Sequence, residues 1–481
     1  MLVLALVLAA APLAVGDGSK GGQVIVLVHD DASLDAVIGT RDVEVVARFR
    51  VLHGFVANVS AAGWKRLSSD PRVSSIEISR TLRMRNEEAA TLTGVREVEE
   101  TYGYTGRGVR IAMLDTGVDR RHPDLDGGLI GEKCFVAPDG CTPDSTAVGE
   151  LAPDSSTGHG THIAGTITGD GVVAPRGIAS ASELVVIRVF DSSGVGSEAD
   201  WTRALDWVLA ERGRFGFQLV NLSLGTDFSY GGTCDSEFPA MATALSKLRA
   251  AGVASFSASG NENVDGGINA PACLTSTIAV GGVYDANLDR EPDNGTYASG
   301  CADDTATAGS VICFSNSSTK VSLLAPGSQI RSSFPGGQVA TKRGTSQAAA
   351  HATAVAALLL EADPTLTPQT LESMLVMSGV PTLDPKTGLT TPRIDALAAV
   401  TLTLQTQCSR RAAGASCTLT PTTQGMCTDG TCVVRTFPVL TSEFPAAGCA
   451  TTPTLAGAGL LTLALAAWRR HRRASKHADR D

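Results

Sequence analysis

The chain has 481 residues, of which 43% are hydrophobic and 18% charged, and its formal net charge is −10. This composition predicts a large globular core divided into roughly three structural units, and the negative charge argues against a nucleic-acid partner. The chain has 11 cysteines, which is many for a cytosolic protein and typical of an exported one.

The first 16 residues are mostly apolar and end in Ala14-Val15-Gly16. This pattern predicts a secretory signal peptide over residues 1–16, although the usual basic start is missing. A buried first strand is the weaker alternative, because the Gly-rich stretch that follows is typical of a flexible linker.

Residues 22–80 alternate between strand and helix patterns in the order β-α-β-β-α-β, which predicts a small ferredoxin-like α+β domain. Residues 81–91 are polar and charged, and we expect them to form an exposed linker. Strands are expected at 23–28, 43–49, 55–59 and 73–78, and helices at 33–38 and at 61–68, where Ser60 is the expected cap.

From residue 92 to about 403 strands and helices alternate, which predicts an α/β domain with a mostly parallel sheet flanked by helices. Strands are expected at 182–190, 217–224, 253–257 and 277–283, and helices at 198–212, 238–251, 347–360 and 368–377.

Two motifs in this domain carry residues that support catalysis. Asp115 ends an apolar run and precedes Thr-Gly, which predicts a carboxylate at the C-terminal edge of a buried parallel strand, where open α/β sheets place their sites. His159 lies between two glycines, which are expected to leave room for a substrate. Taken alone, Asp115 could be a cap and His159 could form a metal pair with His162, but the absence of a nearby Cys or Glu makes that a poor zinc site.

A third motif places a hydroxyl before a helix. Ser346 follows Gly344-Thr345 and precedes the Ala- and Leu-rich stretch 348–360. We expect Ser346 at a helix N-terminus, where unpaired N–H groups and the helix dipole favour developing negative charge. The alternative is that Ser346 or Thr345 serves only as an N-cap.

Together, Asp115-Thr-Gly, His159-Gly-Thr-His and Gly-Thr-Ser346 resemble the motifs of the subtilisin-like serine proteases, the subtilases, and most closely their proteinase K branch. The order Asp, His, Ser is the one described for subtilisin, and the resemblance covers about residues 22–403. It implies a subtilisin-like fold over 92–403 in which Ser346 attacks the scissile carbonyl. His159 would then transfer the proton, and Asp115 would orient the imidazole.

The resemblance also implies how a peptide is bound. Asn261 would donate its side-chain amide to the oxyanion beside the N–H of Ser346. Two loops would hold the substrate backbone as an added strand, and the small residues near them would leave room for a large apolar P1 side chain. Ordinary turns are the alternative for each segment. The residues concerned are Gly194, Val195, Gly196, Ser223, Leu224, Gly225, Ser259 and Gly260.

By the same resemblance, residues 22–80 would be an inhibitory pro-domain that assists folding and blocks the site. Its removal would require a cut between Met84 and Ala90. An unrelated small domain is the alternative, since a fold alone does not imply a function.

The cysteines fall into three sequence-neighbour pairs and a cluster in a Cys-rich segment, residues 404–436. We expect the neighbours to pair, although connectivity does not follow from sequence. The cluster lacks Cys-x-x-Cys and His, which favours a small disulfide module over zinc. The pairs are Cys134 with Cys141, Cys234 with Cys273 and Cys301 with Cys313, and the cluster is Cys408, Cys417, Cys427 and Cys432.

After a linker, 437–453, come the mostly apolar stretch 454–468 and a basic tail, 469–481. A helix of this length spans about 22 Å, short of the ~30 Å hydrocarbon core. The arrangement, with Cys449 ahead of it, resembles bacterial C-terminal sorting tails. That implies a protein held outside the cytoplasm and attached to the membrane, either permanently or transiently. An amphipathic or disordered end is the alternative.

The chain departs from the family pattern at three positions: Gln347 replaces the usual Met, Ala350 the usual Pro, and Ser322 an Asp that binds calcium in many relatives. We therefore predict no metal and no cofactor. The leading hypothesis is a secreted endopeptidase acting on proteins or peptides. The alternatives are a catalytically silent subtilase-fold module that binds surfaces, and an α/β-hydrolase esterase, which would need Gly-x-Ser-x-Gly and the order Ser, acid, His.

Overall fold

The computed structural model describes residues 22–38, 42–49, 53–78, 87–136, 154, 157–288, 301, 303, 306–420 and 423–434. The expected signal peptide, Cys141, Cys449, the stretch 454–468 and the basic tail lie outside these residues. Among the helices that the structure describes, none is long and apolar enough to cross a membrane.

The N-terminal part forms the expected β-α-β-β-α-β unit, with one antiparallel sheet in the order β2-β3-β1-β4. Alternate residues of β1 and β3 point into a core around Phe55 and Leu67. Ser60 caps the second helix as predicted, accepting from the N–H of Gly63. The elements are β1 Gly22–Val28, α1 Asp31–Ile38, β2 Val43–Arg48, β3 Gly54–Val59, α2 Ala61–Ser68 and β4 Val73–Ile78.

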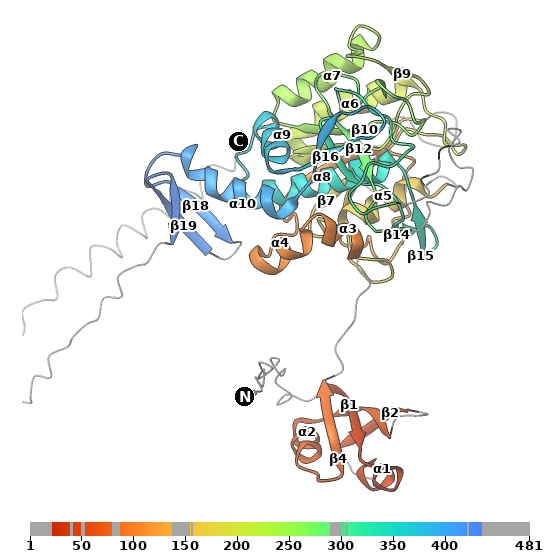
Figure 1. Ribbon diagram of the computed structural model, residues 1–481, viewed down its shortest axis with the longest axis vertical. Helices are drawn as coiled ribbons and strands as arrows, with labels where there is room; N and C mark the ends of the chain where they lie inside the picture. Colours follow the sequence, from red (N-terminus) through yellow and green to blue (C-terminus); the bar gives the residue numbers. More distant parts are fainter. Residues whose placement is uncertain are drawn as a thin grey trace, which may run out of the picture. The chain divides into compact units, whose positions relative to one another are not determined.

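The catalytic part is built on a nine-stranded sheet in the order β16-β17-β13-β12-β10-β8-β5-β7-β6 (Figure 1). Its strand pairs are parallel except β16 with β17. The fold is therefore the expected subtilisin-like α/β architecture. The strands are β5 Arg110–Asp115, β6 Leu129–Cys134, β7 Glu183–Arg188, β8 Leu219–Leu222, β10 Ala254–Ala258, β12 Ile278–Val283, β13 Leu323–Pro326, β16 Val380–Leu383 and β17 Thr390–Arg393.

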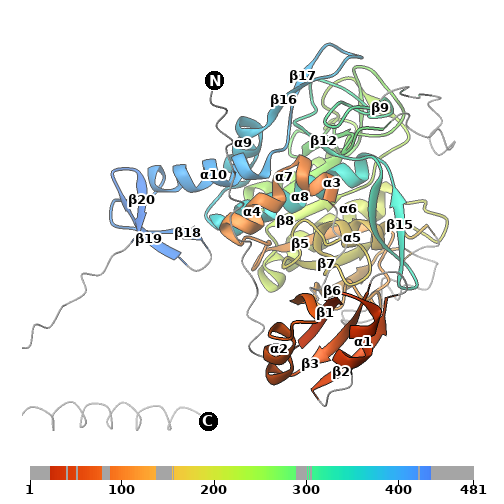
Figure 2. The same cartoon turned by 60° about the horizontal axis from the view of Figure 1, so that its bottom comes forward.

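Helices cover both faces of this sheet, and each face has its own apolar cluster. One cluster gathers α4, α5, α8, α9 and α10, and the other gathers α6 and α7; α10 packs against α4, α8 and α9 (Figure 2). The helices are α3 Glu87–Leu92, α4 Val95–Tyr102, α5 His159–Thr168, α6 Glu198–Phe215, α7 Pro239–Ala250, α8 Thr345–Ala362, α9 Pro368–Ser378 and α10 Ala396–Thr406.

Shorter strands complete this part. The hairpin of β14 (Ile330–Phe334) and β15 (Gln338–Lys342) leads into α8 and packs against α5, and β9 (Ser229–Tyr230) pairs with β11 (Ile268–Asn269). The prediction of an exposed linker over residues 81–91 is wrong for the last residues of that range. They belong to α3, and Ala89 is fully buried.

Helix α8 is almost completely buried. All its residues except Ser346 and Glu361 are buried. Its many alanines let the strands above and α5 and α10 beside it approach closely, so an apolar helix without a solvent-facing side is stable here. Ser346 is thus partly exposed at one end of an otherwise enclosed helix.

The cysteine-rich segment is a small three-stranded antiparallel sheet. Bridges Cys408–Cys427 and Cys417–Cys432 hold it together, so the predicted disulfide module is confirmed. Bridges Cys234–Cys273 and Cys301–Cys313 are also present as expected. Cys134 is disulfide-bonded, and its expected pairing with Cys141 stays a prediction. The segment comprises a 3₁₀ turn at Gln407–Ser409 and β18 Ser416–Thr420, β19 Thr423–Thr428 and β20 Thr431–Val434.

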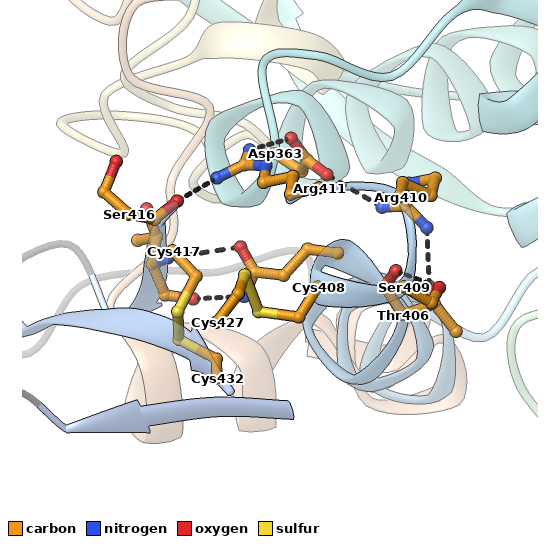
Figure 3. Close-up of a disulfide and its surroundings, with 12 residues drawn as sticks. Asp363, Thr406, Cys408, Ser409, Arg410, Arg411, Ser416, Cys417, Cys427 and Cys432 are labelled. Carbon is orange, nitrogen blue, oxygen red and sulfur yellow. Dashed lines mark hydrogen bonds and ion pairs between the residues drawn. A yellow bond between two sulfur atoms is a disulfide. The ribbon is translucent and has the colours of Figure 1, made fainter. Parts of the chain in front are cut away.

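Two arginines fasten this module to the end of α8 (Figure 3). Asp363 caps the helix, and its side chain is completely buried. Its oxygens accept from Arg410 at 2.7 Å and Arg411 at 2.5 Å, and from Thr365. Burial alone would raise the pKa of Asp363, but the hydrogen bonds from Thr365 and Arg410 outweigh it, and the pKa is lowered. The guanidinium groups also offset a negative charge at the unfavourable end of the helix dipole.

We predict that the double substitution Arg410→Gln and Arg411→Gln destabilises the protein by about 3–5 kcal/mol, because it leaves a buried carboxylate without a cation. Thermal unfolding at fixed scan rate, on a Ser346→Ala background that prevents self-digestion, measures the effect. Arg203→Gln, which removes an exposed pair with Asp200, is the control and should shift the midpoint little.

The same carboxylate predicts a pH dependence. A lowered folded-state pKa contributes stability above the unfolded value of 3.8 and loses it as pH falls through the folded value. The difference in midpoint between wild type and Asp363→Asn should therefore narrow below pH 3.8. If the difference between the two unfolding midpoints stays constant from pH 7 to the acid limit, the Asp363 carboxylate does not stabilise the protein through its contacts with the arginines.

Candidate active site

Asp115 lies at the C-terminal end of β5, at the sheet edge where it was expected, and is fully buried. Its Oδ1 accepts from the N–H of Thr116 at 2.7 Å and from Nδ1 of His159 at 2.7 Å. A carboxylate only accepts, so Nδ1 carries the proton of neutral His159. Nε2 is therefore the nitrogen that can take a proton from a nucleophile.

His159 is the first residue of α5, and its side chain is 27% exposed. Burial alone would lower the pKa of His159, but the charge and hydrogen bond of Asp115 outweigh it and raise the pKa. The imidazolium that forms during proton transfer is thus stabilised.

The expectation that the flanking glycines leave room for a substrate is wrong. Gly158 has a φ of 59°, and a Cβ there would lie 2.4 Å from the ring of Phe334. A Cβ on Gly160 would lie 1.9 Å from the carbonyl oxygen of Gly117. The protein's own chain occupies the space, so the glycines allow α5 to pack against its neighbours.

His162 does not form a metal pair with His159. Its ring is buried, and Nε2 donates to the carbonyl oxygen of Ile330 at 3.0 Å. Burial lowers the pKa of His162 to about 3, so the ring is neutral. The only described trio with metal-ligand geometry is Cys408, Cys417 and Cys432, and these sulfurs are already in disulfides.

Ser346 lies in the first turn of α8, as expected. The N-cap is Gly344, which has no side chain to cap with, so the reading of Ser346 or Thr345 as a mere cap is wrong. In this state Ser346 Oγ donates to the carbonyl oxygen of Ser223 at 3.3 Å, and Ser223 Oγ donates to the carbonyl of Ser346 at 2.8 Å. Catalytic hydrogen bonds often tighten only when a substrate is bound.

Asn261 follows β10 and is oriented by the residue before Ser346. Its Oδ1 accepts from the N–H of Thr345 at 2.8 Å and from Thr345 Oγ1 at 3.1 Å. With the oxygen engaged, the amide presents its Nδ2 donors elsewhere. Thr345 Oγ1 also accepts from Gly260 N–H, so one threonine couples the two segments expected to form an oxyanion hole. Sequence reasoning did not identify this role of Thr345.

The two loops expected to bind a substrate backbone lie at one pocket of about 330 Å³. Gly194, Val195 and Gly196 line it together with Gly225, whereas Leu224 is buried. The rest of the lining consists of the aromatic residues Phe190, Trp201, Phe228 and Phe238, with Met241 and the polar residues Glu198, Thr226 and Asp227.

The room expected beside Ser259 and Gly260 is filled. Ser259 Oγ donates to the carbonyl of Asn316, and a Cβ on Gly260 would lie 2.2 Å from Asn316 Nδ2. Glu262 Oε2 accepts from Asn316 Nδ2 at 2.6 Å and from Asn269 Nδ2 at 3.1 Å. Polar side chains therefore fill the space beside Ser259 and Gly260, where the small residues of the sequence had predicted room for a P1 side chain.

Sequence reasoning missed two charged groups near His159. Asp154 accepts hydrogen bonds from Thr116 and Thr161, and Lys342 Nζ donates to the carbonyl oxygen of Thr157 at 3.0 Å. Neither lies in a recognisable motif. Proximity in sequence to His159 and Ser346 was the only signal available.

The sequence is similar to that of known proteins over much of its length. The sequence model of the subtilase family matches residues 106–399. Subtilisin E of Bacillus subtilis (strain 168) is 28% identical over 341 residues, covering 69% of this chain and 76% of its own. Alkaline serine exoprotease A of Vibrio alginolyticus is 30% identical over 360 residues, covering 72% of this chain and 58% of its own.

Among solved structures, a cold adapted subtilisin-like serine proteinase is 29% identical and has a TM-score of 0.47, covering 61% of this chain and 91% of its own. The family match spans more than half of the sequence and contains Asp115, His159, Asn261 and Ser346. The chain therefore belongs to the subtilase family of serine proteases.

Proposed function

We propose that this protein is a secreted or surface-attached serine endopeptidase, made as a self-processed precursor, with Asp115, His159 and Ser346 as its catalytic triad. The observation that carries the proposal is the 2.7 Å hydrogen bond from His159 Nδ1 to the buried carboxylate of Asp115. It fixes the tautomer in which Nε2 is the base. A fold used only as a binding module has no need of this arrangement.

The chemistry follows from these positions. His159 Nε2 takes the proton of Ser346 Oγ as the oxygen attacks the scissile carbonyl, and returns it to the leaving amine. The oxyanion would be held by Asn261 Nδ2 and the N–H of Ser346, both fixed before the substrate arrives because Thr345 holds the Asn261 amide. Water then releases the acyl group by the same proton transfers in reverse.

The substrate would be an extended peptide. Its backbone would pair with the segments 194–196 and 223–225, and an apolar side chain would enter the aromatic pocket. Val195 and Phe228, exposed by 65% and 74%, would be covered in the complex, which favours apolar side chains by burial. The polar groups beside Gly260 make a purely apolar P1 pocket less favoured than the sequence suggested, and we propose broad P1 acceptance.

The N-terminal unit, residues 22–80, would be the intramolecular inhibitor, released by a cut in the stretch between Met84 and Ala90. The disulfides support an oxidising, extracellular compartment. Membrane attachment through 454–468 remains part of the proposal.

A fluorophosphonate probe tests the proposal directly. Labelling at Ser346 together with casein hydrolysis would support an endopeptidase, whereas ester hydrolysis without casein hydrolysis would favour an esterase. Absence of labelling and of both activities in the matured protein would leave the silent binding module.

We predict that Ser346→Ala accumulates as a precursor that keeps the 22–80 unit, because the enzyme's own site cuts the linker. Expression in a host lacking other proteases, followed by intact mass, is the measurement. Ser246→Ala, at an exposed position on α7, is the control and should mature normally. Maturation of Ser346→Ala at the wild-type rate would show that another protease does the processing.

We also predict resistance to peroxide. In most relatives a Met beside the nucleophile becomes a polar sulfoxide, whereas Gln347 has no sulfur. Gln347 is buried, and its Nε2 lies 3.4 Å from His162 Nδ1, so its amide is directed to the core rather than to the oxyanion site. Wild-type activity should persist in peroxide, and Gln347→Met should lose it.

Mass spectrometry gives this prediction an internal control. Met377 is 71% exposed and lies on α9, so it should form sulfoxide in both proteins without affecting activity. Met113 is fully buried and should react slowly. Rapid loss of wild-type activity while Met113 stays unoxidised would contradict the prediction.

A further inference from the structure

Helix α5, which carries His159, begins without a capping side chain of its own. Its N-cap is Gly158. The N–H groups of the first turn are satisfied from elsewhere: Gly160 N donates to Thr116 Oγ1 at 2.9 Å, and Thr161 N donates to Asp154 Oδ2 at 2.9 Å. Such groups are costly to leave unpaired in a buried turn.

The carboxylate of Asp154 connects both sides of the Asp115–His159 pair. Oδ1 accepts from Thr116 Oγ1 at 2.6 Å, and Thr116 follows Asp115 directly. Oδ2 accepts from Thr161 Oγ1 at 2.5 Å as well as from Thr161 N. One carboxylate side chain thus links the end of β5 to the first turn of α5. Burial raises its pKa above the usual value, and the hydrogen bonds from Thr116 and Thr161 oppose that shift.

The hydroxyl of Thr116 has one proton and two possible acceptors. It lies 2.6 Å from Asp154 Oδ1 and 3.3 Å from Asp115 Oδ1. The shorter bond to an ionised acceptor is the stronger one, so the proton goes to Asp154. Asp115 Oδ1 is then left to the N–H of Thr116 and to His159 Nδ1.

We propose that Asp154 is a positioning residue for His159: through Thr116 and Thr161 it holds the first turn of α5 so that Nδ1 stays on Asp115. The inference rests on the proposed peptidase function. An amide at position 154 changes this network. With its oxygen on Thr161, its NH₂ group faces Thr116 Oγ1, and the Thr116 hydroxyl then turns its proton to Asp115 Oδ1, the oxygen that also accepts from His159 Nδ1.

Four charged or titratable groups interact electrostatically with His159. They are Asp115 from β5, Asp154 from the loop before α5, Lys342 from β15, and His162 on α5 itself. Asp115 and Asp154 raise the pKa of His159, while Lys342 lowers it. Removing the charge of Asp154 therefore lowers this pKa, and the base stays neutral to a more acidic pH.

The test is Asp154→Asn in the matured enzyme, assayed with a peptide substrate and normalised to active sites titrated by fluorophosphonate. We expect kcat to fall by about a hundredfold, the loss typical of a catalytic group displaced by an ångström. KM should hardly change, because Asp154 does not contact the substrate. The acid limb of kcat/KM should move to lower pH, which a merely structural defect would not cause.

Asp119→Asn is the matched control. Among the described residues, this neighbouring carboxylate accepts from the backbone N–H groups of Arg121 and Gly336. The substitution makes the same chemical change in a side chain that does not bond Thr116 or Thr161, and it keeps the backbone N–H of Asp119 that donates to Thr161 Oγ1. It should leave kcat within a few-fold of wild type.

A double-mutant cycle shows whether Asp154 acts through Thr116. Thr116→Val should lower kcat, and Thr116→Ser, which keeps the hydroxyl, should restore it. Combining Asp154→Asn with Thr116→Val should cost little more than the larger single loss, because both remove one network. If Asp154→Asn does not fold, the contrast between Thr116→Val and Thr116→Ser carries the test.

The inference is wrong if the wild type is active and Asp154→Asn has the same kcat and pH profile. It is also wrong if the kcat losses of the two single variants multiply in the double variant. Equal kcat for Thr116→Val and Thr116→Ser would also overturn it. By contrast, a wild type that neither labels at Ser346 nor cleaves peptides would overturn the proposed function instead.

Discussion

Burial of α8 is the constraint on which the rest of this structure depends. A helix of alanine, leucine and valine with no polar face is stable only when it is enclosed, and the parallel sheet, α5 and α10 enclose it. Its two ends then have distinct roles. Ser346, the proposed nucleophile, lies partly exposed in the first turn of the helix. At the other end Asp363 is buried and needs the two arginines of the disulfide module.

In the candidate site, each functional side chain is oriented by a hydrogen bond from or to a second residue. Asp115 orients His159, Thr345 orients Asn261, and Asp154 joins the segments that carry the first pair. Because these groups are partly or wholly buried, each hydrogen bond is stronger than it would be in water and each missing partner is more costly. The geometry is therefore set before a substrate arrives, as electrostatic stabilisation of an oxyanion requires.

Local patterns were enough to predict much of this. The apolar run before Asp115 and the Ala-rich stretch after Ser346 correspond to β5 and α8, because hydrophobic periodicity and helix propensity act locally. What local patterns could not show depends on contacts between distant segments. The role of Asp154 is recognised only when Thr116 is seen beside it, and the space beside Gly260 is seen to be filled only when Asn316 is placed against it. The bridge Cys408–Cys427 joins the 3₁₀ turn at Gln407–Ser409 to β19, a contact that sequence spacing does not predict.

A crystal structure of the matured enzyme with a peptide boronic acid or fluorophosphonate bound would test the central claim most directly. We expect a covalent bond to Ser346 Oγ, with one oxygen of the adduct accepting from Asn261 Nδ2 and the N–H of Ser346. His159 Nε2 should lie within hydrogen-bond distance of the adduct while Nδ1 stays on Asp115. Attachment at another residue, or an adduct oxygen directed away from Asn261, would contradict this account of the site.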